Sequence, residues 1–238
     1  MNIALIGYGK MGMAIEEIAL QRGHEIVLKI NIDNLEDNTI KNIQRADVAI
    51  EFSGPESAYE NVIRCIDARV PVVCGSTGWL HRFEEAKQHS NEKNGALIYA
   101  SNFSVGVNIF FALNKSLASL LAQHPEYDVD ITEIHHTQKR DAPSGTAISL
   151  AEQILEKILR KKKWINQPGN DPAELSILSE RIDPAPGTHR IRYHSDIDDI
   201  EIVHTAHNRK GFATGAVLAA EFIQGKKGIF SMADVLGI

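Results

Sequence analysis

Cysteine is scarce in this chain of 238 residues, where only Cys65 and Cys74 occur, both in apolar surroundings. A disulfide framework needs several cysteines at repeated spacings, and two isolated thiols do not supply one. We therefore expect both cysteines to be buried thiols in a protein of a reducing compartment.

Long apolar runs and an excess of positive charge are absent as well. No apolar run approaches the ~20 residues of a membrane-spanning helix, and the opening residues MNIALIGYGK carry no basic leader typical of a signal peptide. The formal net charge of -6 gives no overall field that attracts nucleic acid or anionic membranes. The one basic run, RKKK at 160–163, is expected to complement the dipole at a helix end. The sequence thus predicts a cytoplasmic protein without nucleic-acid or membrane partners.

Apolar stretches typical of buried strands alternate with helical patterns through the first hundred residues. We expect strands within 2–7, 25–30, 46–52, 70–75 and 96–101, and helices within 13–23, 56–69 and 80–95. Strands separated by helices imply right-handed crossovers and a mostly parallel sheet. This order predicts an α/β fold with a Rossmann-type doubly wound parallel sheet.

The pattern changes after residue 103. A long helix is expected over 106–125, a strand over 127–136, a helix over 146–163, paired strands over 188–195 and 199–206, and a last helix over 212–228. The segment 164–187 is rich in turn formers and is predicted to be a surface loop. These elements predict a second, smaller α+β domain.

The first expected strand and helix are joined by the glycine-rich sequence GYGKMG. Gly7 permits a tight turn, Gly9 lets a pyrophosphate approach the backbone, and Gly12 allows the helix to pack closely on the strand. Asp33 is expected at the end of the second strand, where a carboxylate accepts hydrogen bonds from the ribose hydroxyls of a dinucleotide. Two further loops, CGSTG at 74–78 and YASNFSVG at 99–106, follow later strands, at the edge where doubly wound sheets bind ligands.

The segment EIHHTQKRDAPSGTA at 133–147 concentrates proton-carrying and anion-binding groups. His135 and His136 end a strand and should point to opposite sides unless the strand breaks there. Lys139 and Arg140 follow in a loop, and Ser144 is a plausible N-cap of the next helix. Cations beside a helix N-terminus form an anion pocket, and a histidine that titrates near neutrality can transfer a proton.

Two other interpretations of this segment remain. The histidines could be a hydrogen-bonded pair at a strand end, followed by a solvated Lys-Arg turn. A metal ion could bind a set chosen from Glu133, His135, His136, His204 and His207. We expect no metal, because adjacent histidines diverge on a strand and no compact ligand spacing is present.

The segment 133–147 resembles the His-His-x-x-Lys-x-Asp-Ala-Pro-Ser-Gly-Thr-Ala signature of the dihydrodipicolinate (4-hydroxy-tetrahydrodipicolinate) reductases. CGSTGW, SNFSVGVN and HTAHNRKGFATGAVLAAEFI are similar to other blocks of that family, in the expected order. The segment 181–189 keeps Arg181, Gly187 and His189 of a further block. The glycine loop is one residue shorter than in many members, and the connection between the second and third strands is short.

The resemblance implies a homotetrameric enzyme of lysine and diaminopimelate biosynthesis that reduces 4-hydroxy-tetrahydrodipicolinate with NAD(P)H. In it, the 4-hydroxyl of a cyclic imine dicarboxylate is lost, hydride adds at C4, and a proton goes to the neighbouring carbon. Residues 1–103 and 213–238 would form the dinucleotide-binding domain, and residues 104–212 the substrate-binding and oligomerisation domain. Segments 101–107 and 207–215 would be hinges beside a cleft.

Residue roles follow from the same resemblance. His135 would be the proton donor and acceptor, and Lys139 a second proton donor. His136, Gly145 and Thr146 would hold the substrate carboxylates. The cofactor would contact Gly7, Tyr8, Gly9, Lys10, Met11, Gly12, Asp33, Gly75, Ser76, Thr77, Ala100, Ser101, Asn102 and Phe103.

Two rival functions are another two-domain reductase of an amino-acid or dicarboxylate substrate, and a nucleotide-sensing regulator without turnover. The presence of both histidines and Lys139 argues against the sensor. The residues themselves favour NADH over NADPH, although NADPH remains possible. A 2′-phosphate would meet the Asp33 carboxylate, and the adjacent Asn34 offers no compensating positive charge.

Overall fold

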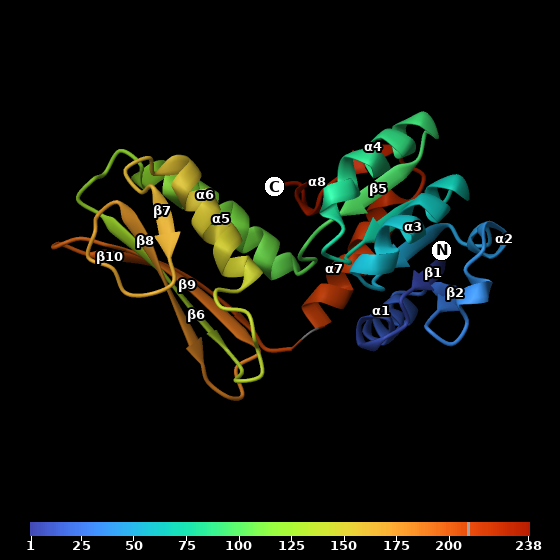
Figure 1. Cartoon of the computed structure of the whole chain (residues 1–238), viewed down its shortest axis with the longest axis horizontal. Helices are drawn as coiled ribbons and strands as arrows, with labels where there is room; N and C mark the ends of the chain where they lie inside the picture. Colours follow the sequence, from blue (N-terminus) through green and yellow to red (C-terminus); the bar gives the residue numbers. More distant parts are fainter. Residues whose placement is uncertain (209) are drawn as a thin grey trace. The chain divides into compact units, whose positions relative to one another are not determined.

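The computed structural model describes residues 1–208 and 210–238. Arg209, which belongs to the expected hinge at 207–215, lies outside the described residues. The chain divides into two compact units (Figure 1). The first comprises Met1–Val105 and Lys210–Ile238, and the second comprises the intervening chain from Gly106 onward.

The first unit is built on a six-stranded sheet in the order β11-β5-β4-β3-β1-β2, with every neighbouring pair parallel. The strands are β1 (Asn2–Ile6), β2 (Glu25–Ile30), β3 (Val48–Glu51), β4 (Val72–Cys74), β5 (Ala96–Tyr99) and β11 (Gly228–Phe230).

Helices cover both faces of this sheet. One face carries α1 (Lys10–Gln21), α7 (Lys210–Ile223) and α8 (Met232–Leu236), and the other carries α2 (Ile40–Ile43), α3 (Pro55–Asp67) and α4 (Phe83–Glu92). Along β1, Ile3 and Leu5 pack on the first face while Ala4 and Ile6 pack on the second, because strand side chains alternate. The predicted Rossmann-type doubly wound fold is confirmed.

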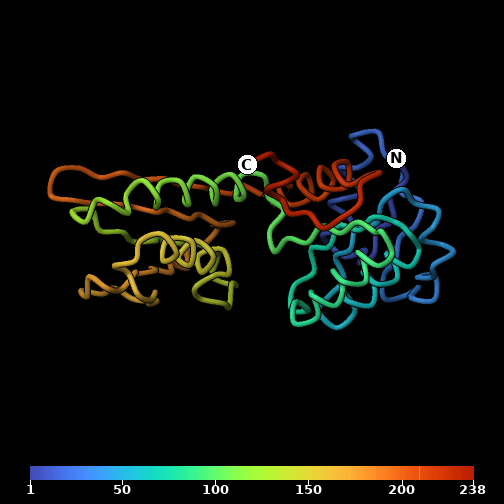
Figure 2. The backbone as a smooth tube through the Cα atoms, turned by 90° about the horizontal axis from the view of Figure 1, so that it is seen from above, coloured from blue at the N-terminus to red at the C-terminus, as the bar shows by residue number. Residues whose placement is uncertain are grey.

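Two short 3-10 helices, η1 (Leu35–Asp37) and η2 (Leu80–Arg82), complete the first unit. The C-terminal segment returns to this unit, where α7 packs against α1 (red and blue in Figure 2).

Cys65 and Cys74 are buried free thiols, and burial raises the pKa of both. Among the described residues, every helix falls short of the length and apolarity that crossing a bilayer requires.

The second unit is a five-stranded mixed sheet in the order β10-β9-β6-β8-β7 with two helices on one face. Its elements are α5 (Val105–Leu121), β6 (Asp128–His135), α6 (Gly145–Lys157), β7 (Lys163–Ile165), β8 (Glu174–Arg181), β9 (Gly187–His194) and β10 (Asp199–Ala206). Strand β6 pairs antiparallel with β9 and parallel with β8. Ile131, Ile177 and Ile191 from these three strands meet helices α5 and α6 in the core.

Three expectations about residues 146–187 are wrong. Helix α6 ends at Lys157, and the predicted surface loop contains strands β7 and β8. The basic run lies beyond the end of α6 and is not a solvated helix end: Lys161 is 3% exposed, and its Nζ lies 2.5 Å from Asp128 and donates to the Glu174 carbonyl at 2.6 Å. Arg160 Nη1 instead donates to the Ala122 carbonyl, directly after α5, at 3.3 Å. In β8, Leu175 and Ile177 alternate with polar residues, a short strand pattern obscured by the turn formers around it.

Candidate active site

The glycine loop between β1 and α1 is shaped by close backbone contacts. Gly7 has a φ of 96°, and a Cβ there would lie 2.3 Å from the Phe52 carbonyl carbon. A Cβ on Gly12 would lie 2.6 Å from the Gly7 carbonyl oxygen. Gly9, the N-cap of α1, has nothing within 4 Å of its Cβ position. The loop therefore leaves open space at a helix N-terminus, where a pyrophosphate fits the geometry and the dipole.

Phe52, at the end of β3, joins three segments that the sequence identified separately. Its backbone contacts Gly7, and a Cβ on Gly75 would lie 2.2 Å from its ring. Its ring centroid also lies 5.6 Å from that of Phe103. The loops that begin at Gly7, Gly75 and Ala100 are thus assembled at the carboxyl edge of the sheet, around a residue that sequence reasoning did not select.

Ser76 has the features of a ligand-binding residue in this group. It is 7% exposed, and its Oγ has no hydrogen-bond partner among the described residues. Its carbonyl accepts a hydrogen bond of 2.8 Å from Nε1 of the buried Trp79, which fixes the loop. A buried hydroxyl without a partner is costly unless a ligand or a water forms a hydrogen bond with it. Together with the open glycine loop, Ser76 therefore fits a nicotinamide dinucleotide.

Asp33 does not lie at the end of the second strand. Strand β2 ends at Ile30, and Asp33 is exposed in the following turn, where its N–H donates to Asn31 Oδ1 at 2.7 Å. Asn34 holds this turn together: its Nδ2 donates to the Lys29 carbonyl at 2.9 Å, and its Oδ1 accepts from the Asn31 N–H at 2.8 Å. The Asp33 carboxylate stands in solvent beside the sheet edge.

Tyr8 and Lys10 differ in their surroundings. The Tyr8 hydroxyl donates to Glu16 of α1, and Glu16 also pairs with Lys29 Nζ at 2.7 Å. Lys10, at the start of α1, is exposed. The positive charge of Lys29 is therefore partly neutralised, whereas Lys10 faces solvent near the glycine loop.

In the second unit, the centre of the predicted site is Glu133, which is completely buried on β6. Its Oε1 accepts hydrogen bonds from the Ser144 N–H at 3.0 Å, Ser179 Oγ at 2.8 Å and Arg181 Nη2 at 3.3 Å. Burial raises the pKa of Glu133, but the nearby His189 and the hydrogen bonds from Ser144 and Ser179 outweigh it and hold the pKa well below its usual range. Glu133 is therefore a buried carboxylate that ties strands and helix together.

Two histidines face the other oxygen of Glu133. His135 Nδ1 lies 3.5 Å and His189 Nε2 lies 3.6 Å from Oε2, and the two rings are edge to face with centroids 5.1 Å apart. Burial lowers the pKa of His135 to about 4, although the Glu133 charge raises it. The expectation that His135 titrates near neutrality is wrong for the protein without substrate: its imidazole is neutral there.

The loop after β6 carries His136 and Lys139, the latter predicted as a second proton donor. The strand ends at His135, so His136 lies beyond it and strand alternation does not fix its direction. Lys139 Nζ pairs with the Asp141 carboxylate at 2.8 and 2.9 Å. Arg181 holds the loop by donating to the Asp141 carbonyl at 2.6 Å and the Lys139 carbonyl at 3.3 Å.

Helix α6 begins next to this loop. Ser144 is its N-cap, as predicted, and its Oγ accepts from the Ala147 N–H at 3.2 Å. The N–H groups of Gly145 and Thr146 belong to the first turn, which has no intrahelical acceptors for them. They offer a place for a carboxylate oxygen beside the positive end of the helix dipole.

Sequence reasoning missed Glu133 and His189 as members of one site. Among the described residues, Glu133, His135 and His189 are the group with ligand atoms close enough to hold a metal ion, within 4.8 Å of one another. His136, His204 and His207, which the sequence offered as ligands, do not belong to it. The i, i+2 spacing of Glu133 and His135 was visible, but the pairing of β6 with β9 that brings in His189 was not.

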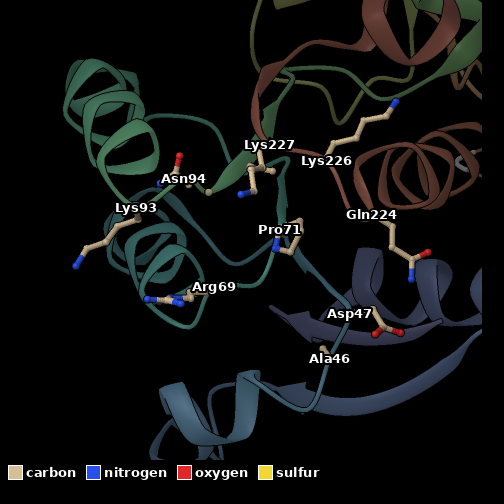
Figure 3. A pocket seen from close by; sticks show the side chains of 12 residues that line it. Ala46, Asp47, Arg69, Pro71, Lys93, Asn94, Gln224, Lys226 and Lys227 are labelled. Carbon is tan, nitrogen blue, oxygen red and sulfur yellow. The ribbon is translucent and has the colours of Figure 1, made fainter.

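A hollow of about 670 Å³ lies at the opposite edge of the first sheet (Figure 3). Arg69, Asn94 and Gly225, each with positive φ, follow helices α3, α4 and α7 there. Lys93 Nζ lies 3.9 Å from the Asp67 carboxylate there, and Lys226 Nζ lies 3.0 Å from the Phe222 ring centroid. The hollow is therefore explained by helix ends and is not the predicted cofactor site, which is at the carboxyl ends of the strands.

Comparison with known proteins covers nearly the whole chain. Residues 1–103 match the family model described as dihydrodipicolinate reductase, N-terminus, and residues 106–236 match the one described as dihydrodipicolinate reductase, C-terminus.

Among curated relatives, the 4-hydroxy-tetrahydrodipicolinate reductase of Christiangramia forsetii is 50% identical over 99% of this chain and 98% of that protein. The enzyme of the same name from Neisseria gonorrhoeae is 34% identical over 94% of this chain and 84% of that protein. In fold, the chain is similar to a dipicolinate-bound dihydrodipicolinate reductase from Paenisporosarcina sp. TG-14, with a TM-score of 0.79, 23% identity and 98% of each chain covered.

Proposed function

The chain belongs to the dihydrodipicolinate reductase family, and from that premise we propose how its own residues carry the reaction. It is an oxidoreductase that reduces 4-hydroxy-tetrahydrodipicolinate to tetrahydrodipicolinate with NAD(P)H in lysine and diaminopimelate biosynthesis. When bound, the nicotinamide supplies the hydride. The protein supplies position, charge and a proton.

His135 delivers the proton to the carbon next to the one that accepts hydride. The observation that carries this role is its burial against Glu133, beside the open N–H groups of α6. In the free protein its pKa is lowered to about 4. A dianionic substrate places negative charge near the ring, which favours the protonated form and raises the pKa toward neutrality. Binding of substrate therefore favours protonation of His135, and the Glu133 carboxylate, 3.5 Å from Nδ1, stabilises the charged ring.

The substrate carboxylates are held by Lys139, His136 and the N–H groups of Gly145 and Thr146. Lys139 exchanges Asp141 for a substrate carboxylate, and this exchange needs little motion because Arg181 keeps the loop backbone in place. A lysine at this position also offers a second proton. Charge-assisted hydrogen bonds of this kind are the strong ones, so they contribute to substrate affinity as well as to orientation.

The cofactor is held by the loops that begin at Gly7, Gly75 and Ala100. Gly7 to Gly12 contact the pyrophosphate, Gly75 to Thr77 and Ala100 to Phe103 line the nicotinamide half, and Asp33 accepts from the adenosine ribose hydroxyls. NADH is preferred to NADPH, because the exposed Asp33 carboxylate repels a 2′-phosphate.

The active enzyme is a cytoplasmic homotetramer with two-fold contacts. The face of the second sheet that carries no helix supports the oligomer, because its apolar Val203 is 53% exposed and a second copy of the chain would cover it.

The test is oxidation of NADH by the purified protein with enzymatically generated substrate. His135→Ala should lower kcat by on the order of 10²-fold with little change in cofactor affinity. Lys139→Ala should raise KM and lower kcat together. Gln138→Ala, an exposed neighbour in the same loop, is the matched control and should keep wild-type kinetics. Wild-type kcat in His135→Ala would remove His135 from proton transfer.

A further inference from the structure

We propose that Glu133, His135 and His189 form a binding site for a divalent late transition-metal ion, with Zn²⁺ as the best match, and that the bound ion inhibits the enzyme reversibly. The inhibition, but not the binding, rests on the proposed role of His135 as the acid.

The strand pairing places all three side chains on one face of the second sheet. Glu133 and His135 are two residues apart on β6, so both project to the same side. His189 on β9 is directly opposite Glu133 in the antiparallel register. All three are buried: Glu133 is 0%, His135 8% and His189 5% exposed. The donors are therefore held by a rigid sheet rather than by a loop.

Two distances within this group are close to those between the ligands of a tetrahedral metal ion, and all three ligand atoms lie within 4.8 Å of one another. His135 Nδ1 and His189 Nε2 lie 3.5 and 3.6 Å from the same oxygen, Glu133 Oε2, too long for good hydrogen bonds. A tetrahedral ion with bonds of about 2.0–2.1 Å to nitrogen and oxygen has ligand atoms about 3.4 Å apart. Moreover, the buried His135 Nδ1 has no hydrogen-bond partner among the described residues.

The surroundings of the carboxylate resemble a prepared ligand. Its Oε1 is occupied by hydrogen bonds from Ser144, Ser179 and Arg181, which orient the group and leave Oε2 to face the histidines. Oε2 also accepts from the Ser144 N–H at 3.1 Å, and His189 Nε2 has a hydrogen-bond partner in Ser144 Oγ at 3.1 Å. This hydroxyl must turn away when an ion binds, and the fourth coordination position is left to water.

The donor set also predicts which ions bind. Two imidazoles and one carboxylate are the ligands of zinc sites with an open position, whereas Mg²⁺ and Ca²⁺ prefer oxygen ligands. A metal on Nδ1 leaves His135 with its only proton on Nε2 and prevents formation of the imidazolium. The ring then cannot act as the acid, so metal binding and turnover exclude each other.

The experiment uses the full-length protein after treatment with a chelator. Co²⁺ is titrated and followed by its visible absorption, Zn²⁺ is then added to displace it, and NADH oxidation is measured over the same Zn²⁺ range. We expect one equivalent of Co²⁺ with the spectrum of a low-coordinate nitrogen–oxygen site, no response to Mg²⁺, and inhibition by Zn²⁺ that the chelator reverses.

Variants distinguish metal binding at this site from metal binding by histidines on the surface. His189→Gln and Glu133→Gln should each weaken Co²⁺ binding by roughly tenfold or more. His194→Gln is the matched control on the same strand: its side chain is 39% exposed, and it should bind Co²⁺ as the wild type does. Circular dichroism checks the fold, and His135→Gln replaces Glu133→Gln if that variant does not fold.

If the wild type and His189→Gln bind Co²⁺ equally well, the proposal that these three residues bind the metal ion is wrong. Binding at the site without inhibition overturns the exclusion of turnover. Absence of NADH oxidation in the chelator-treated protein would instead count against the proposed function, and leaves the metal titration readable by its spectrum.

Discussion

Replacement of Gly215 by alanine tests whether α7 sets the position of the predicted cofactor segment 100–103. Gly215 is buried in α7, and a Cβ there would lie 1.7 Å from the Phe103 carbonyl oxygen and 2.8 Å from its carbonyl carbon. Ordinary contact at such positions starts at 3.4 Å, so helix or carbonyl must move by about 1.7 Å, and neither is the end of a flexible side chain.

The expected cost follows from two opposed effects. Overpacking of a tight core costs about 1–3 kcal/mol, and more where backbone must shift, while alanine in a helix gains up to about 1 kcal/mol over glycine. The net loss is about 2 kcal/mol in the free energy of unfolding, which corresponds to a decrease in Tm of roughly 4–8 °C. Because Phe103 is predicted to line the cofactor, the Kd for NADH should rise roughly tenfold.

Thermal unfolding of the cofactor-free protein and a fluorescence titration with NADH measure both effects. Gly211→Ala is the control from the same helix, since its Cβ would meet the Ser104 side chain at ordinary distances, Oγ at 3.4 Å and Cβ at 4.0 Å. It should keep the wild-type Tm and Kd or raise the Tm slightly. If Gly215→Ala unfolds and binds NADH as the wild type does, the close approach of α7 to Phe103 is not a constraint on the fold or the site.

Three further predictions concern charge. Asp33→Ala should raise the ratio of kcat/KM for NADPH to that for NADH by roughly tenfold, measured with both cofactors; Asn34 should be left unchanged because it holds the turn. Lys161→Ala should lower the free energy of unfolding by about 2 kcal/mol, because a buried stem and its hydrogen bond are lost, whereas the exposed Lys162→Ala should change it by less than about 0.5 kcal/mol in urea titrations. The pKa of Glu133 is lower in the folded than in the unfolded protein. Its charge therefore contributes fully to stability at a pH above the unfolded-state pKa, and this contribution is lost as the pH falls through the folded-state pKa. Unfolding measured from about pH 7 to 3 should therefore show the advantage of the wild type over Glu133→Gln shrinking on the acid side, and a constant difference would contradict the charged state of Glu133.

Local patterns were sufficient for the fold class and for much of the site. The glycine loop, the alternation of strands and helices and the N-cap Ser144 depend on residues close together in sequence, and each was readable there. Other features depend on pairing across the chain. Phe52 gains its role by contact with three separate loops, and His189 reaches Glu133 only through the register of β6 and β9.

The protonation state of His135 could not be predicted for a related reason. Residue type sets the ordinary pKa, but the shift to about 4 comes mainly from burial, which is a property of the assembled sheet. Strand β8 was missed because a short alternating pattern between turn formers has little signal of its own, and only its pairing with β6 and β7 makes it a strand.

The return of the C-terminal segment to the first unit has a consequence for synthesis. Residues 1–105 leave the ribosome first, with Ile15 of α1 and Val73 and Ile98 of the sheet on a face that α7 covers in the finished protein. More than a hundred residues separate this part from α7, and at about 5–20 residues per second their translation takes roughly 5–20 s. During that interval the apolar face is without α7, and at its end the intervening unit, which is continuous in sequence, has every residue it needs to fold. The middle unit can therefore be completed before the first one, whose sheet has an uncovered apolar face until α7 is synthesised.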